Sequence, residues 1–98
     1  MTETVGSEAQ QRAITDMQTL VLEITRALVD EPEAVHVDSL HDAGATVIRL
    51  RVSPRDLGKV IGKQGRTARS LRTILGAASM KLKHRFALDI VEVEGSEG

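Results

Sequence analysis

The amino-acid sequence predicts one small domain of the α+β class, in which three helices cover one face of a three-stranded mixed sheet. An early and a late segment repeat apolar residues at spacings of three and four, which is the pattern of a helix with one buried face. Shorter segments alternate apolar and polar residues, as half-buried strands do. The chain has 98 residues, enough for one hydrophobic core. The predicted order is helix, strand, strand, helix, helix, strand.

The two ends of the chain are polar. Residues 1–13 are acidic and lack apolar periodicity, so we expect a flexible N-terminal tail there and a flexible C-terminal tail at residues 95–98. The domain is therefore assigned to residues 14–94. Its first helix begins near Ile14 and ends before Pro32, because the residue that precedes a proline is disfavoured in the helical conformation.

A β-hairpin is predicted next. Its strands cover residues 34–40 and 46–52, and the residues between them, 41–44, have turn chemistry and are few enough for an antiparallel connection. Arg49 and Arg51 are expected on the face opposite the apolar residues of the second strand, because side chains alternate across a strand.

Two helices and a strand complete the domain. Ser53 and Pro54 are typical of a helix start, since serine caps the first turn and proline suits the first helical position. Gly62 ends this short helix, a longer helix is predicted over residues 66–83, and a third strand over residues 86–94. The two-helix crossover makes the third strand parallel to the second, with a right-handed connection.

The composition excludes several classes of protein. The sequence has no cysteine, so it has no disulfide and no thiolate metal site. It shows no basic and apolar leader and no apolar run of about 20 residues, so we expect a cytoplasmic protein without a membrane segment. The histidines, His36, His41 and His84, are scattered, and no nucleophile accompanies a base. We therefore expect no metal, no cofactor and no catalysis.

Positive charge is concentrated in one part of the chain. Between Arg49 and Arg85 there are eleven Lys or Arg residues and one acid, Asp56, although the formal net charge of the whole chain is −1. Lys and Arg often form only a solvated face, and that interpretation stays open. The size of the excess, and its overlap with a glycine turn, favour a polyanionic ligand. Asp56 itself is interpreted as the acid of a helix start.

The glycine turn lies in the run VIGKQGR at residues 60–66, between two predicted helices. Gly62 and Gly65 can adopt positive φ, and the following helix directs free amide N–H groups and the positive end of its dipole toward the turn. Lys63 and Gln64, between the glycines, are long and polar. A plain connector is the alternative interpretation. A nucleoside triphosphate loop is excluded, because Gln64 stands where that motif has its metal-binding Ser or Thr.

The scarcity of aromatic residues restricts the ways in which this chain could bind a nucleic acid. Phe86 is the single aromatic residue of the sequence, and we expect it in the core. RNA-recognition sheets and oligonucleotide-binding barrels stack bases on exposed aromatic side chains, so that device is excluded. A module that clamps about four nucleotides by their backbone at a Gly-x-x-Gly loop needs no aromatic residue. The residues therefore fit a single-stranded nucleic acid that is held by its backbone.

The run LGKVIGKQGRT at residues 57–67 resembles the signature of the K homology (KH) domain, and the predicted order of elements resembles its type II topology. Residues 16–93 are similar to the family of small bacterial single-KH RNA-binding proteins called KhpA. This resemblance implies a type II KH fold and a non-catalytic RNA-binding protein of the bacterial cytoplasm, such as an RNA chaperone or post-transcriptional regulator. It also implies a larger KH partner protein of the Jag or KhpB type, with homodimer formation as an option. The N-terminal extension departs from the compact family pattern.

The predicted RNA site combines the glycine turn, the cations beside it and an aliphatic groove. We expect the two glycines to admit the phosphate backbone, Lys63 and Arg66 to neutralise it, and the apolar residues to contact bases. The full predicted set is Lys59, Val60, Ile61, Gly62, Lys63, Gln64, Gly65, Arg66 and Arg69. The alternative function is a protein–protein interaction module that forms homo- or heterodimers through the same surface.

Overall fold

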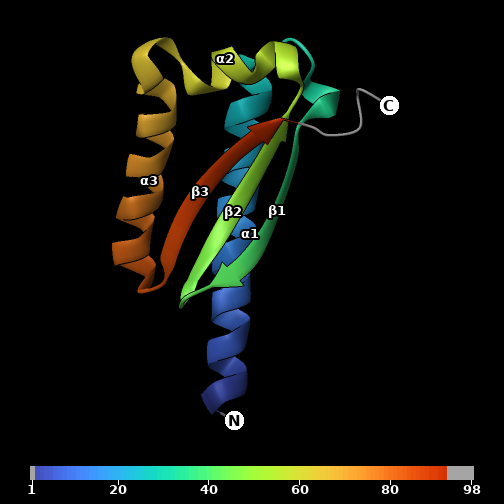
Figure 1. The fold of residues 1–98 in the computed structure, drawn as a ribbon. Helices are drawn as coiled ribbons and strands as arrows, with labels where there is room; N and C mark the ends of the chain where they lie inside the picture. The colour runs from blue at the N-terminus through green and yellow to red at the C-terminus, as the bar shows by residue number, and fades with distance from the viewer. Residues whose placement is uncertain (1, 93–98) are drawn as a thin grey trace.

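The computed structural model describes the backbone of residues 2–92 and the side chains of residues 8–92. Its helices are α1 (Thr2–Leu28), α2 (Leu57–Ile61) and α3 (Arg66–Leu82), and its strands are β1 (His36–Asp42), β2 (Ala45–Val52) and β3 (Arg85–Glu92) (Figure 1). Short 3-10 turns cover Pro32–Ala34, Pro54–Asp56 and Lys63–Gly65. The order of helices and strands is the predicted one, and the α+β class is confirmed.

The sheet is mixed, with β2 as its central strand. β2 pairs antiparallel with β1 and parallel with β3. Because β1 extends to Asp42, the hairpin turn consists of Ala43 and Gly44 alone, not of the predicted residues 41–44. These two residues have φ angles of 53° and 81°, and a two-residue turn of this kind requires positive φ at both positions.

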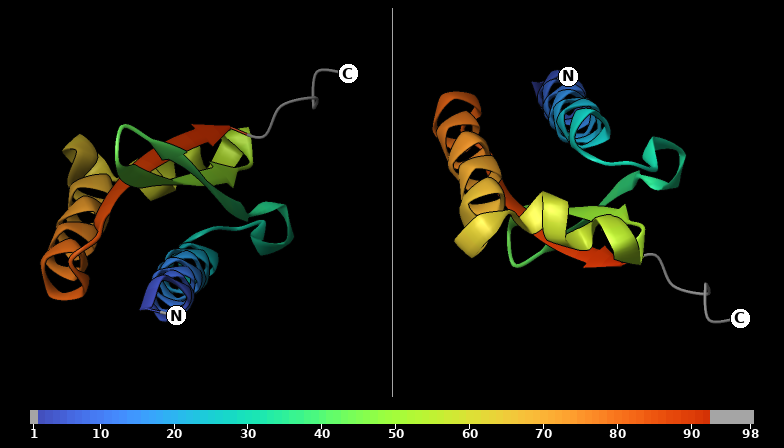
Figure 2. Two further views of the ribbon diagram at one scale, coloured as in Figure 1. Left: turned by 90° about the horizontal axis from the view of Figure 1, so that it is seen from below. Right: turned by 90° about the horizontal axis from the view of Figure 1, so that it is seen from above.

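The hydrophobic core lies between the sheet and the helices. Ile48, Leu50 and Val52 alternate along β2 and are fully buried, whereas Arg49 and Arg51 lie on the opposite face, as predicted. The helices and β3 add Val21, Val60, Leu71, Leu75, Phe86 and Leu88 to this core. Figure 2 shows α1 and α3 on the same side of the sheet, with α3 alongside β3.

Helix α1 is longer than predicted. It begins at Thr2, and its N-terminal part projects beyond the sheet in Figure 1. The sequence prediction began the helix near Ile14 because burial begins there: residues 8–12 are exposed, and Ala13 and Ile14 are the first buried side chains. Residues such as Ala, Gln and Glu favour a helix without contributing to a core, which explains the extension. The mobility of residues 1–13 stays a prediction, and residues 95–98 lie outside the described part.

Asp56 has a structural role that the sequence did not reveal. Its carboxylate is 1% exposed and accepts hydrogen bonds from the backbone N–H groups of Asp30, at 3.1 Å, and Glu31, at 2.9 Å. These N–H groups belong to the segment that leaves α1. Asp56 therefore ties the end of α1 to the start of α2, and so fixes the helix that leads into the glycine turn.

Candidate nucleic-acid interface

The glycine turn forms a sharp elbow between α2 and α3, at one corner of the molecule (Figure 1). Helix α2 ends as the N–H of Gly62 donates to the carbonyl of Gly58 at 2.8 Å. The turn closes as the N–H of Gly65 donates to the carbonyl of Gly62 at 3.0 Å. Gly62, Gln64 and Gly65 all have positive φ, at 83°, 59° and 73°. These three positive φ angles turn the chain sharply within four residues.

The two glycines of the elbow have different surroundings. A Cβ atom on Gly62 would lie 2.8 Å from the backbone nitrogen of Thr67 and still closer to the Thr67 hydroxyl, so the first turn of α3 packs directly against this glycine. A Cβ atom on Gly65 would meet no atom within 4 Å. Gly62 is thus needed by the fold, whereas Gly65 leaves open space at the entrance to α3.

The polar side chains of the elbow face solvent. Lys63, Gln64 and Arg66 are exposed, and Arg66 Nη2 donates to Gln64 Oε1 at 3.1 Å. Gly65 is the N-cap of α3 and has no side chain to bind the amide groups of the first turn. The start of α3 therefore presents backbone donors, the positive end of a 17-residue helix and two cationic side chains at the same place.

The structure divides the predicted cations into paired and unpaired residues. Among the described side chains, 8–92, no carboxylate oxygen lies within 4.0 Å of a charged nitrogen of Lys63, Arg66 or Arg69. Lys59 differs, because its Nζ lies 3.1 Å from Asp30 Oδ2. Arg55 and Arg51, elsewhere in the basic segment, likewise pair with Glu31 and Asp38. Of the predicted cations, those of the elbow and the first turns of α3 are therefore unpaired among the described side chains, whereas Lys59 is paired.

The two aliphatic residues predicted to contact bases are placed differently. Val60 is fully buried and packs in the core, so it supports α2 and offers no surface to a base. Ile61 is 38% exposed and lies directly before the elbow. The apolar residues of α2 are Leu57, Val60 and Ile61, and of these Val60 alone is fully buried, Leu57 is partly buried and Ile61 is exposed.

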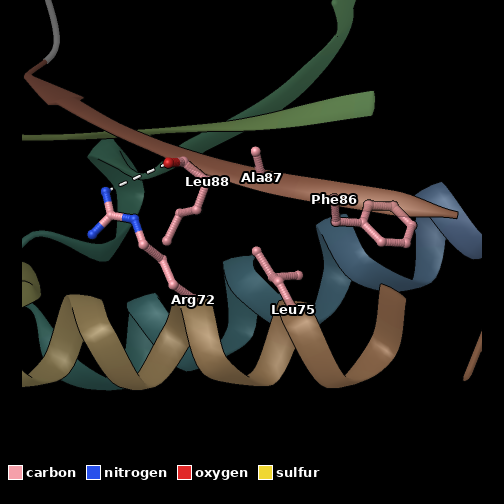
Figure 3. Close-up of a pocket in the computed structure, with 5 residues that line it drawn as sticks. All are labelled: Arg72, Leu75, Phe86, Ala87 and Leu88. Carbon is pink, nitrogen blue, oxygen red and sulfur yellow. Dashed lines mark hydrogen bonds between the residues drawn. The ribbon is translucent and has the colours of Figure 1, made fainter. Parts of the chain in front are cut away.

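A pocket whose lining residues the sequence did not predict lies between α3 and β3 (Figure 3). Its volume is about 200 Å³, and Arg72, Leu75, Phe86, Ala87 and Leu88 line it. The pocket brings together the middle of α3 and the beginning of β3, so it depends on how the helix lies beside the strand. The i, i+3 spacing of Arg72 and Leu75 was the one signal in the sequence, and it did not indicate which strand these residues face.

Two of the histidines meet at the far end of the sheet. His84 Nε2 lies 2.6 Å and His41 Nδ1 lies 3.3 Å from the buried hydroxyl of Thr46. Strand pairing brings these residues together although they are far apart in the sequence. Within the described part of the chain, no group of three or more His, Cys, Asp or Glu residues is arranged to hold a metal ion. The helices of this part also lack a stretch with the length and hydropathy that a membrane-spanning segment requires.

Comparisons with known proteins agree with this geometry. The family described as KhpA/KhpB, KH domain, matches residues 18–90. The chain is 48% identical over 75 residues to the RNA-binding protein KhpA of Caldanaerobacter subterraneus subsp. tengcongensis, covering 76% of this chain and 100% of that protein. It is 51% identical over 76 residues to the RNA-binding protein KhpA of Halalkalibacterium halodurans, covering 78% of this chain and 100% of that protein.

Among solved structures, the chain is similar to Era, in a crystal structure of its complex with MgGDPNP and nucleotides 1506-1542 of 16S ribosomal RNA. The TM-score is 0.56 at 18% sequence identity, so this likeness concerns the fold alone. It covers 83% of this chain but 31% of the Era chain. With the glycine elbow, the mixed sheet and the family match over residues 18–90, the resemblance noted in the sequence is confirmed: the chain belongs to the KhpA/KhpB KH-domain family.

Proposed function

We propose that this protein binds single-stranded RNA at the Gly-x-x-Gly elbow, without catalysis, as an RNA chaperone or post-transcriptional regulator of the cytoplasm. The observation that supports this most strongly is the cluster of unpaired cations at the start of α3, beside backbone donors that no side chain caps. The relatives at 48% and 51% identity are named RNA-binding proteins, which supports the same ligand.

The residues of the elbow and of α3 make different contacts with the RNA in this proposal. One phosphate lies over Gly65, where the absence of a side chain leaves open space. Lys63, Arg66 and Arg69 neutralise the backbone, and exposed Ile61 supplies an apolar contact for a base. Lys59 joins them only by leaving Asp30, so we expect a smaller contribution from it.

The experiment is a double charge reversal in the elbow. Lys63→Asp with Gln64→Asp places two anions where phosphates bind, and we expect loss of RNA affinity with the fold retained. Aspartate tolerates the positive φ of position 64 better than most residues, so the elbow keeps its backbone conformation. Binding is measured by fluorescence anisotropy with a labelled single-stranded oligonucleotide.

Gln11→Asp with Arg12→Asp is the matched control. It makes the same change in net charge at two exposed positions of α1, away from the elbow. We expect this control to lose affinity only slightly, through long-range repulsion that salt screens. Equal affinities of the two double variants would remove the elbow from the site.

The second candidate function is protein–protein association, as a homodimer or with a larger KH protein of the Jag or KhpB type. Ile74, 42% exposed, and Met80, 82% exposed, are apolar residues of α3 that a partner packed on this helix would cover. Light scattering after size exclusion, with and without RNA, separates the two functions. A tight dimer that does not bind RNA would favour association, whereas an RNA complex of the monomer would favour the first proposal.

A further inference from the structure

A second cluster of cations lies at the end of the molecule opposite the glycine elbow (Figure 1). It consists of Lys81 and Lys83 at the end of α3 and Arg85 at the start of β3, and we call it the far-end cluster. All three side chains are exposed. Among the described side chains, 8–92, no carboxylate oxygen lies within 4.0 Å of their charged nitrogens. Within this part of the chain the far-end cluster is therefore open to an anionic ligand.

The turn that joins α3 to β3 directs these cations away from the core. Ser79 Oγ accepts a hydrogen bond from the N–H of Phe86 at 3.0 Å, and the carbonyl of Ser79 accepts one from the N–H of His84 at 3.2 Å. The rings of His84 and Phe86 contact each other edge to face, and Phe86 is buried. Because side chains alternate along a strand, Arg85 lies on the opposite side from Phe86. The turn therefore holds Lys83 and Arg85 outside the core.

Lys83 stands at a position that glycine would hold more easily. Its φ of 55° and ψ of 42° are left-handed, and it forms the C-cap of α3. This conformation is strained in a residue with a Cβ atom, which is why glycine is usual at such a helix end. The negative end of the helix dipole favours a cation there, but the backbone does not require the lysine side chain. Lys83 can therefore be replaced without loss of the fold.

The far-end cluster is separated from the elbow by the length of α3. The helix has 17 residues, and a rise of about 1.5 Å per residue gives about 25 Å. No Lys or Arg occurs between Arg72 and Lys81, so the cations form two separate groups. A Gly-x-x-Gly loop holds about four nucleotides. At about 3.4 Å per nucleotide of a stacked strand, about eight further nucleotides bring one strand from the elbow to the far-end cluster.

We propose that the far-end cluster is a second contact for the phosphate backbone of the RNA strand that the elbow holds. This inference rests on the proposed RNA binding and extends the contacted RNA from about four nucleotides to about twelve. Once the elbow has bound a strand, the rest of that strand is present at high effective concentration near the cluster, so a few weak contacts suffice. A separate acidic protein would depend on three exposed charges that salt screens, which favours the RNA strand as the ligand.

One acid of the sheet lies on the same side as the far-end cluster. Asp42 pairs with Ala45, and Ala45 pairs with Arg85, so the three residues form one row across the sheet. Neighbouring strands are about 4.8 Å apart, which places Asp42 about 10 Å from Arg85. Interactions between exposed charges are largely screened beyond about 10 Å at ordinary salt. Asp42 therefore competes only weakly with a phosphate that contacts Arg85 directly.

The experiment compares a labelled oligouridine pentamer, which reaches the elbow alone, with a tetradecamer, which reaches both groups of cations. Fluorescence anisotropy measures the affinity of each over a series of salt concentrations. For the wild type, the logarithm of the association constant should fall more steeply with the logarithm of salt for the tetradecamer, by about 0.7 for each added phosphate contact.

Lys81→Gln with Lys83→Gly removes two cations of the cluster, and the glycine relieves the left-handed backbone, so we expect the fold to be kept. The variant should bind the tetradecamer about fivefold more weakly, which corresponds to about 1 kcal/mol for two exposed contacts. Its salt slope for the tetradecamer should be shallower by about 1.4. Its affinity for the pentamer should equal that of the wild type. The comparison at equal RNA length removes the advantage that a longer strand has from offering more positions to the elbow.

Arg26→Gln with Arg55→Gln is the matched control. It removes the same charge at two exposed positions outside the far-end cluster, one on α1 and one before α2. We expect this control to keep the salt slope of the wild type with both RNA lengths.

Three results would overturn the inference: equal salt slopes of the wild type for the two lengths, tetradecamer binding that survives the loss of Lys81 and Lys83, or equal losses of affinity for both lengths in that variant. The second result would favour an acidic protein as the ligand of the cluster. All three leave RNA binding at the elbow intact, because the pentamer tests it separately. Failure of the wild type to bind either length would instead contradict the proposed function.

Discussion

At the scale of single residues, Gly62 has φ 83° and ψ 167°, a combination that only glycine adopts without strain, and it also packs against Thr67. Gly62→Ala should therefore lower the free energy of unfolding by about 1 to 3 kcal/mol from backbone strain, with a further loss from the contact. Gly65→Ala should cost about 1 to 2 kcal/mol, because its φ of 73° is left-handed but the surrounding space is open. Urea denaturation of both variants measures the two losses, and the loss should be larger for Gly62→Ala than for Gly65→Ala.

The buried carboxylate of Asp56 gives a second stability prediction. Asp56→Asn keeps the shape but replaces one acceptor oxygen by an NH₂ group, which cannot accept from the N–H of Asp30 or Glu31. We expect a loss of about 1 to 3 kcal/mol in the free energy of unfolding. Asp89→Asn is the control, since Asp89 is exposed on β3 and should change stability by less than about 0.5 kcal/mol. Similar losses for both variants would contradict the role given to Asp56.

Sequence reasoning was most successful for residues whose environment follows from local pattern. Lys63 and Gln64 are exposed because they occupy a polar turn, and Arg49 is opposite the core because strands alternate. The ion pair of Lys59 with Asp30 was not predictable, since it depends on the end of α1 packing beside α2. The same holds for Asp56, whose partners lie 25 and 26 residues earlier in the chain.

At the scale of elements, the strands and α3 were predicted within one or two residues because their periodicity is strong. The beginning of α1 was missed, because a helix can continue on propensity alone beyond the point where burial ends. The α3–β3 pocket was missed for another reason. The residue pattern of a helix or strand indicates which of its faces is apolar. The pattern does not indicate how the face of α3 is aligned with the face of β3.

The exposed start of α1 predicts that the domain tolerates its removal. Deleting residues 1–12 removes no buried side chain among residues 8–12, so the free energy of unfolding should change by less than about 1 kcal/mol and RNA affinity should stay the same. Deleting residues 1–22 also removes Ile14 and Val21 from the core and should prevent folding. Thermal melting followed by circular dichroism measures the stability of the two deletion variants, and fluorescence anisotropy measures their RNA affinity. Loss of RNA binding in the shorter deletion would give the extension a role in the site.

At the scale of the whole molecule, opposite charges are segregated, which is how a chain of net charge −1 can bind a polyanion. Two acids in the segment that follows α1 and one acid on β1 pair with Lys59, Arg55 and Arg51. The elbow and the first turns of α3 keep their cations unpaired. Net charge alone predicts weak repulsion from RNA. Interactions between exposed charges fade over about 10 Å at ordinary salt, so RNA at the elbow interacts mainly with the charges nearby. The cations of the elbow therefore predict attraction at that corner of the molecule.

The number of unpaired cations sets the salt dependence of RNA binding. If Lys63, Arg66 and Arg69 each neutralise one phosphate of a single strand, the logarithm of the association constant should fall with the logarithm of salt concentration with a slope of about −2. Arg69→Gln should make this slope shallower by about 0.7, since one phosphate contact is lost. Arg55→Gln should leave it nearly unchanged, because Arg55 is paired with Glu31. Anisotropy titrations over a series of salt concentrations measure all three slopes, and a flat response of the wild type would show that the cations of the elbow do not contact the RNA backbone.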